Sequence, residues 1–313
     1  MSKHIPLAVA AGLLAALFYV SIVTGRQEML FLSFFTQLPL FLAGLGIGYP
    51  AIKIAALAGV VLCLLMGGNY YSLAFLLLNA APVTLFVRQA LLSRTDAEGK
   101  QEWYPLGHLV SWISATAVVM FVALFLLLAG DERGVEANVR EFLSEILTVF
   151  LGNTTAETAT VVDTVAPFFP AFVVGWWLFM VFANGVLAQS LVARFNRNVR
   201  PSPDFSKMEL PDWITYALAV AALVFLMTGS GTWEFFGRNL VLILCIPFFL
   251  LGLAVIHAFA RVTVQPRWVL IPFYIFLIMF GGFAAMVVTG FGFVEQVIGI
   301  RRRLPSSANR LEE

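Results

Sequence analysis

The chain has 313 residues, of which 60% are apolar and only 12% are charged, and its formal net charge is +1. A soluble domain is typically about half apolar and about a quarter charged, so this composition argues against a soluble catalytic domain and against a nucleic-acid-binding surface. All 18 acidic residues lie outside the long apolar runs. Because a helix needs about 20 apolar residues to cross a bilayer, the pattern predicts an all-α, polytopic transmembrane helical bundle in one integral membrane domain, residues 1–313.

Nine apolar segments follow one another along the chain. In order they cover about 7–24, 29–48, 52–66, 70–92, 106–129 and 167–192, and three more begin near Trp213, Asn239 and Trp268. We expect about eight or nine spans in total, of which eight cross fully and one is re-entrant or tilted.

Lysine and arginine in the connecting loops predict the orientation, since cytoplasmic loops carry an excess of both. With a cytoplasmic N-terminus, eleven such residues fall in cytoplasmic segments and four in the opposite loops. The tail disagrees, because Arg301–Arg303 would emerge on the opposite side if all nine segments crossed. We therefore expect the segment that does not cross to lie late in the chain.

Two connectors divide the sequence. The longer, 130–166, is acidic and contains an amphipathic helix predicted at 134–151, which is interpreted either as an interfacial helix on the membrane or as a lid over an outward-facing cavity. The other, 194–212, is polar and rich in proline, and is predicted to be a cytoplasmic linker. It separates a first helical half, 1–193, from a second, 213–303, which a polar tail, 304–313, follows.

Catalytic and metal-binding patterns are absent from the sequence. Cys63 and Cys245 both lie in apolar runs, where cysteine usually acts as a small hydrophobic residue, so we expect no disulfide, metal or cofactor. No nucleophile, zinc or phosphate-binding motif occurs, and the intramembrane carboxylates of proton pumps and membrane proteases are missing. We predict that the protein is not an enzyme; a lipid-modifying activity is the least favoured reading.

Polar side chains inside the spans are few. They are Gln37, Asn79, Ser111, Ser114, Asn184, Gln189 and His257. Each needs a hydrogen-bond partner in hydrocarbon, so each is expected to face the bundle or a cavity. Asn79, Asn184 and His257 are the candidate substrate-binding residues, although an intramembrane asparagine also commonly joins two helices.

Small residues form a face on the first span. Ala8, Gly12 and Ala16 recur every four residues, and Ala11 and Ala15 form a second row. Such rows allow close helix approach in lipid. They predict either internal packing or docking of a partner membrane subunit.

Three stretches carry a family resemblance: Phe34–Gly46, Gly252–His257, and a last span with Gly290 and Gly292 before the tail 299–303. Together they resemble the uncharacterised YybS-like family of predicted bacterial membrane proteins, over most of the chain. That family is distantly similar to the S components of energy-coupling-factor vitamin transporters and to the membrane protein of the rod-shape system.

The resemblance implies an S-component-like N-terminal part and a location in the bacterial cytoplasmic (inner) membrane. It also implies that the small-residue face of the first helix would dock a transmembrane coupling partner. Two hypotheses follow. The first is a small-molecule-binding, transport-type protein without an intrinsic ATPase; the alternative is a membrane scaffold for cell-envelope machinery. The expected partners are the lipid bilayer and other membrane subunits, not nucleic acid.

Overall fold

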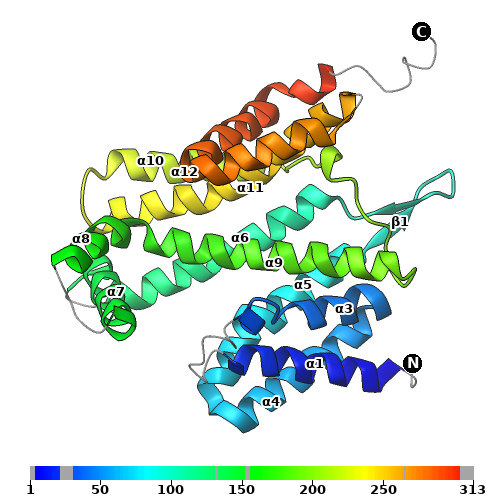
Figure 1. The fold of residues 1–313 in the computed structure, drawn as a ribbon, viewed down its shortest axis with the longest axis horizontal. Helices are drawn as coiled ribbons and strands as arrows, with labels where there is room; N and C mark the ends of the chain where they lie inside the picture. The colour runs from blue at the N-terminus through cyan, green and yellow to red at the C-terminus, as the bar shows by residue number, and fades with distance from the viewer. Residues whose placement is uncertain (1–3, 22–30, 131–132, 152–155, 264, 304–313) are drawn as a thin grey trace. The chain divides into compact units, whose positions relative to one another are not determined.

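The computed structural model describes residues 4–21, 31–130, 133–151, 156–263 and 265–303 (Figure 1). The described residues are predominantly helical, and this confirms the predicted all-α membrane bundle. Five helical stretches among them are long and apolar enough to cross a membrane, and three shorter apolar helices accompany them.

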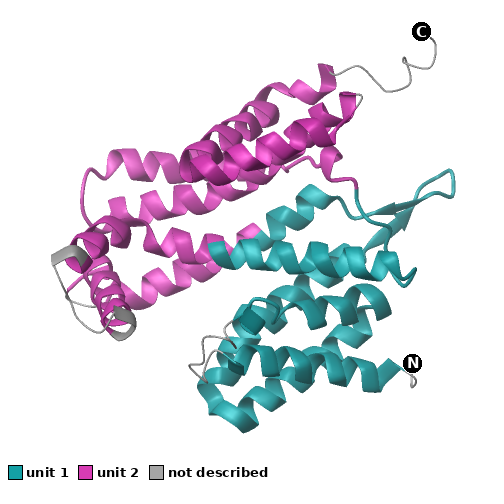
Figure 2. Cartoon of the chain, in the orientation of Figure 1, with its two compact units in different colours: residues 1–113, 176–203 teal, residues 114–175, 204–313 magenta. Residues whose placement is uncertain are grey.

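The chain forms two compact units, which interleave along the sequence (Figure 2). Unit 1 comprises residues 1–113 and 176–203, and unit 2 comprises 114–175 and 204–313. This division differs from the predicted halves, because 114–175 packs with the C-terminal helices. The boundary at Pro203 does fall inside the predicted linker.

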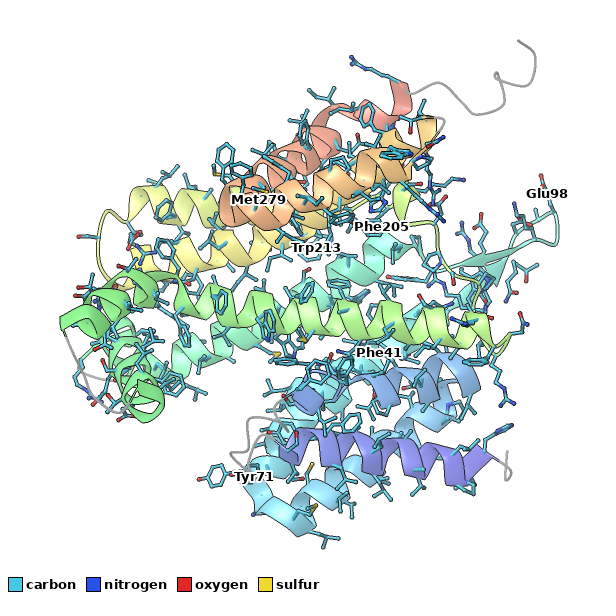
Figure 3. All side chains as sticks on the ribbon, viewed as in Figure 1. Phe41, Tyr71, Glu98, Phe205, Trp213 and Met279 are labelled. Carbon is cyan, nitrogen blue, oxygen red and sulfur yellow. The ribbon has the colours of Figure 1, made fainter. Side chains whose placement is uncertain are left out.

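Unit 1 is built from helices and one small β-hairpin. Its elements are α1 (Ile5–Val20), α3 (Leu38–Ile47), α4 (Tyr49–Phe75), the π-helix η3 (Leu76–Ala80), α5 (Ala81–Ala90), β1 (Ser93–Thr95), β2 (Gln101–Trp103), the start of α6 (Leu106–Leu128) and the end of α9 (Phe169–Arg194). The strands pair antiparallel with Arg94 opposite Glu102, and these two side chains form an ion pair at 2.7 Å. Glu98 lies in the turn that joins the strands (Figure 3).

The helix α4 reverses direction at Gly68, whose φ of 76° and ψ of −166° are not helical. Ser72 Oγ donates a hydrogen bond to the Val60 carbonyl, and Phe75 packs against Gly59, so the two arms lie side by side. The predicted segments 52–66 and 70–92 therefore form one helical hairpin. Glycine suits the turn because L side chains rarely adopt such a positive φ.

Unit 2 contains the rest of α6, α7 (Val135–Leu151), α8 (Ala156–Val165), η4 (Ala166–Phe168), the start of α9, η5 (Phe205–Lys207), α10 (Trp213–Met227), α11 (Thr232–Val262), α12 (Arg267–Ile298) and η6 (Ile300–Arg303). Many apolar side chains face outward from these helices; Met279 of α12, for example, is 73% exposed (Figure 3). An apolar outer surface is expected of helices that contact lipid.

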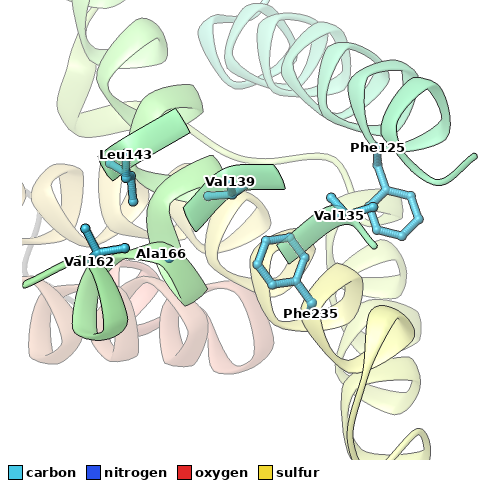
Figure 4. Packing of buried hydrophobic residues seen from close by; sticks show 7 residues of the cluster. All are labelled: Phe125, Val135, Val139, Leu143, Val162, Ala166 and Phe235. Carbon is cyan, nitrogen blue, oxygen red and sulfur yellow. The ribbon is translucent and has the colours of Figure 1, made fainter. Parts of the chain in front are cut away.

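Part of the apolar stripe of α7 is buried against protein. Val135, Val139 and Leu143 pack in a cluster with Phe125, Val162, Ala166 and Phe235, which come from α6, α8, η4 and α11 (Figure 4). The exposed fraction of each of these three α7 side chains is 9% or less. These three side chains therefore contact protein, whereas Phe142 beside them is 51% exposed. The interfacial and the lid interpretations of α7 both remain predictions.

The helix α12 also folds back on itself, at Gly281, where φ is 46° and ψ is −115°. Arg261, shortly before α12, pairs with Asp204, while Arg301, just after it, donates to the Ser206 and Met208 carbonyls. The end of α11, shortly before α12, and the residues just after α12 thus both lie near the segment 204–208, and Figure 1 shows the two arms of α12 side by side. Each arm is about 20–25 Å long, less than the roughly 30 Å of a hydrocarbon core, which suits a re-entrant hairpin.

Backbone contact between α11 and α12 is close at Gly252. A Cβ atom at this position would lie 1.9 Å from the Val288 carbonyl oxygen, whereas one at Gly290 would have nothing within 4 Å. We expect Gly252→Ala to lower the free energy of unfolding by about 1–3 kcal/mol through overpacking. Gly290→Ala should leave it unchanged or raise it slightly, since alanine favours helix. Thermal unfolding of both variants in detergent checks this, and equal midpoints would contradict the close approach.

The fold-back of α12 predicts which residues share a side of the membrane. In a Cys63→Ala, Cys245→Ala background, Lys207→Cys and Arg303→Cys should react with an impermeant maleimide from the same side. Ser230→Cys, in the loop before α11, should react from the other. A straight α12 would instead place residue 303 on the side of residue 230.

Candidate functional site

The centre of the candidate site is a backbone carbonyl that proline leaves free. Pro82 has no N–H, so it cannot donate to the carbonyl of Leu78 four residues earlier. That carbonyl accepts instead from Trp177 Nε1 at 2.8 Å and from Gln37 Nε2 at 3.4 Å. The chain is wound as a π-helix over Leu76–Ala80, with Ala81 N–H donating to the Leu76 carbonyl. Single π-turns of this kind occur frequently at functional sites.

A second freed carbonyl lies at the entry to α3. Pro39 cannot donate to the Phe35 carbonyl, and the Leu38 N–H bonds that carbonyl in a tighter turn at 3.0 Å. The Phe34 carbonyl, which Leu38 would serve in a regular helix, accepts from Asn184 Nδ2 at 2.8 Å. Asn184 also donates to the Met180 carbonyl of its own helix at 2.8 Å. Two side chains of α9 thus hold two proline-interrupted segments.

Two amide oxygens of this cluster are buried without a hydrogen-bond partner among the described residues. They are Gln37 Oε1 and Asn184 Oδ1, on side chains that are each 3% exposed. Asn79, inside the π-helix, is 6% exposed. We call Gln37, Asn79, Trp177 and Asn184 the unit-1 polar cluster. An unsatisfied buried acceptor costs about 1–3 kcal/mol, so a ligand N–H or O–H that reached these oxygens would be stabilised.

The third predicted binding residue, His257, belongs to unit 2. Its Nε2 lies 2.9 Å from the Tyr274 hydroxyl, and its ring contacts the edge of Phe205. The pair joins α11 to the first arm of α12. Asn79 and Asn184 therefore lie in unit 1, and His257 lies in unit 2.

The small-residue face of α1 is covered inside unit 1. Ala8, Ala15 and Ala16 are fully buried, and a Cβ on Gly12 would lie 2.0 Å from the Ala55 carbonyl oxygen of α4. Ala11 is half-buried. This is the geometry of internal packing, the first of the two readings that the spacing allows.

Sequence reasoning included Gln37 among the polar span residues but not among the binding candidates, and it did not single out Trp177. The signal that could have identified both is proline. Pro82 and Pro39 each disturb the regular helical hydrogen bonds before them and so imply a carbonyl that needs a new donor, and indole and amide side chains in apolar spans are the donors to consider.

The predicted linker is held at both ends by arginines. In unit 1 the buried Arg200 donates to the carbonyls of Ala90 at 3.0 Å and Tyr104 at 2.8 Å, and burial lowers the pKa of its guanidinium. In unit 2, Arg301 bonds the Ser206 and Met208 carbonyls as well as buried Glu295 at 2.8 Å. The linker residues 200–208 therefore pack as part of the fold.

Asn239 is a buried asparagine whose side-chain oxygen and nitrogen both have hydrogen-bond partners. Its Oδ1 accepts from the Ala171 N–H at 3.0 Å, and its Nδ2 donates to the Pro167 and Phe235 carbonyls at 2.9 Å each. It is completely buried and connects α11 to the start of α9 within unit 2. All of its hydrogen-bonding groups are used, in contrast to Asn184.

The two asparagines should therefore respond differently to replacement by leucine. Asn239→Leu is expected to lower the free energy of unfolding by about 2–3 kcal/mol, because it leaves the Ala171 N–H and the Pro167 carbonyl unpaired. Asn184→Leu should cost about 1 kcal/mol, since it also removes an unsatisfied oxygen. Thermal unfolding in detergent compares them; an equal or larger loss at position 184 would mean that its oxygen is satisfied.

Comparison with known proteins gives one family. Residues 8–295 match the model of a family described as predicted membrane protein (DUF2232). No curated protein and no solved structure matches the chain. No cluster of three or more metal-ligating side chains occurs within the described ranges.

Proposed function

Because the chain belongs to this family of predicted membrane proteins, we propose that it binds a small polar molecule in the unit-1 polar cluster. It would act as a transport-type membrane protein without its own ATPase. The observation that carries the proposal is the pair of buried, unpartnered amide oxygens on Gln37 and Asn184. In both side chains the amide nitrogen is already bonded to a backbone carbonyl, so the oxygen is held in place as an acceptor.

The chemistry of the cluster selects a class of ligand. Its side chains are two asparagines, one glutamine and one tryptophan, and none is ionisable. The free groups are acceptors, so the ligand needs N–H or O–H donors, as in an amide, an alcohol or a heterocycle with ring N–H groups. A neutral ligand suits this cluster, because a buried charge would have no counter-charge there.

The proposal also includes the resemblance to the YybS-like family and to S components. A YybS-like protein with an S-component-like N-terminal part would lie in the bacterial cytoplasmic membrane with its N-terminus in the cytoplasm. The distribution of lysine and arginine supports that orientation. Since α4 covers the small-residue face of α1, a coupling subunit would contact the opposite face, where Leu7, Leu14 and Leu17 are 43–54% exposed.

The proposal is tested by extracting the full chain from native membranes in mild detergent and identifying retained small molecules by mass spectrometry. The wild type should retain a neutral compound that Asn184→Leu and Gln37→Met each lose, because each variant removes one acceptor. Gln189→Met is the matched control: it lies on α9, and its amide nitrogen bonds the Arg200 carbonyl outside the cluster. That variant should retain the compound.

Two results would overturn small-molecule binding. One is the absence of any stoichiometric compound from the wild type; the other is a compound that all variants keep. If envelope-synthesis or division proteins co-purify in place of a ligand, the scaffold hypothesis explains the protein better.

A further inference from the structure

A basic groove lies between the first arm of α4 on one side and η3 with α5 on the other. Its volume is about 390 Å³, and its polar lining residues are Tyr49, Lys53, Thr84 and Arg88. None of the residues that line it is acidic. The groove is therefore a concave surface that carries two positive charges.

Neither cation has a carboxylate partner in the part of the chain that the structure describes. The Lys53 ammonium lies 5.0 Å from the centre of the Tyr49 ring, and the Arg88 side chain is exposed. Lys53 is the fifth residue of α4 and its one charged residue. A charge in such surroundings is stabilised by a counter-charge, and here no described side chain provides one.

The groove also contains an unused hydroxyl. Thr84 Oγ1 is buried and has no hydrogen-bond partner among the described residues. Threonine hydroxyls inside helices usually bond a carbonyl three or four residues earlier, and Thr148, Thr164 and Thr289 of this chain do so. The Thr84 hydroxyl, by contrast, has no acceptor among the described residues, and Thr84 lines the groove.

The rest of the lining is apolar, and leucines flank it. Leu76, Ala80, Ala81 and Leu85 form the apolar part of the groove. Next to it in sequence, Leu57 is 66% exposed and Leu77 is 53% exposed. An anion that combines a charged head with apolar chains matches both the basic and the apolar part of the groove, whereas a soluble anion would use only the basic part.

We propose that this groove binds the phosphate group of an anionic phospholipid. Lys53 and Arg88 pair with the phosphate oxygens, Thr84 donates a hydrogen bond, and the acyl chains lie on the exposed leucines. Clustered basic residues at a membrane boundary attract anionic lipid in general, and the groove adds a defined position for one headgroup. The site uses none of the residues of the unit-1 polar cluster, so it does not depend on the proposed function.

The experiment uses the full chain in phosphatidylcholine nanodiscs that contain a graded fraction of phosphatidylglycerol, followed by native mass spectrometry of retained lipid. Lys53→Gln with Arg88→Gln should weaken phosphatidylglycerol retention about tenfold or more. Thr84→Val, which changes no charge, should weaken it about threefold. This second variant keeps the test decisive if the double variant does not fold.

Arg194→Gln with Arg197→Gln is the matched control, because it removes the same charge from exposed positions of unit 1 outside the groove. It should weaken retention by less than about threefold. An equal loss in both double variants, or full retention in Thr84→Val, would overturn the site in favour of general surface attraction. Thermal stabilisation of the detergent-solubilised protein by glycerol phosphate or inorganic phosphate, matching that by phosphatidylglycerol, would overturn the lipid assignment.

Discussion

A carbonyl that loses its helical donor to proline must find another hydrogen bond, because hydrocarbon offers none. Unit 1 meets this constraint directly at Leu78, four residues before Pro82. It meets it indirectly at Phe34, because the Leu38 N–H bonds the Phe35 carbonyl that Pro39 leaves free. The helix α9 supplies a donor to both Leu78 and Phe34. The bonded residues are 99 positions apart for Trp177 and Leu78, and 150 apart for Asn184 and Phe34. The 2.8 Å hydrogen bonds to both carbonyls therefore form only after α9 has been made and inserted. Before that, the N-terminal helices offer the Leu78 carbonyl only the longer 3.4 Å bond from Gln37. Contacts of such high sequence separation are slow to form, so unit 1 should complete its packing late.

The amide side chains that donate to these carbonyls also explain why the free polar groups of the candidate site are acceptors. An amide side chain carries both donors and an acceptor, and holding a freed carbonyl uses only the donors. At Asn184 and Gln37 the oxygen remains, fixed in direction by the bonds that the nitrogen makes. Asn239, whose oxygen accepts a backbone N–H, has no acceptor of this kind left. Structural joining and the proposed ligand binding are thus not competing roles for Asn184, because the nitrogen performs the first and the oxygen would perform the second.

Much of the fold followed from apolar length and from charge, whereas the turns within the spans did not. Residues 52–66 and 70–92 were separable because Gly67, Gly68 and Asn69 interrupt the apolar run. The run from Trp268 onward has no polar interruption at Gly281, so hydropathy alone predicts one long segment. Its reversal depends on a positive φ that only the glycine suggests. Burial of Asn79 and Asn184 was foreseeable from the cost of polar groups in lipid, but their partners depend on tertiary contacts that no local pattern encodes.

The reversal of α12 at Gly281 and the three arginines that follow this helix both bear on the position of the C-terminal tail. The charge pattern predicts a tail on the side of Arg261 and Arg267, and the fold-back at Gly281 brings the residues after α12 back to the segment 204–208, with which Arg261 also pairs. Arg301 then fixes the return by bonding Glu295 and two carbonyls of the segment that follows Asp204. Burial acts to raise the pKa of Asp204, but hydrogen bonds from Ser206 and Arg261 outweigh it and lower that pKa, so the carboxylate stays charged beside Arg261. A buried ion pair is costly unless its remaining groups are hydrogen-bonded. In the buried pair of Arg301 and Glu295, the guanidinium donates to the carboxylate and also to the Ser206 and Met208 carbonyls. The C-terminal hairpin is therefore held at its open end by hydrogen bonds and at its closed end by a glycine turn.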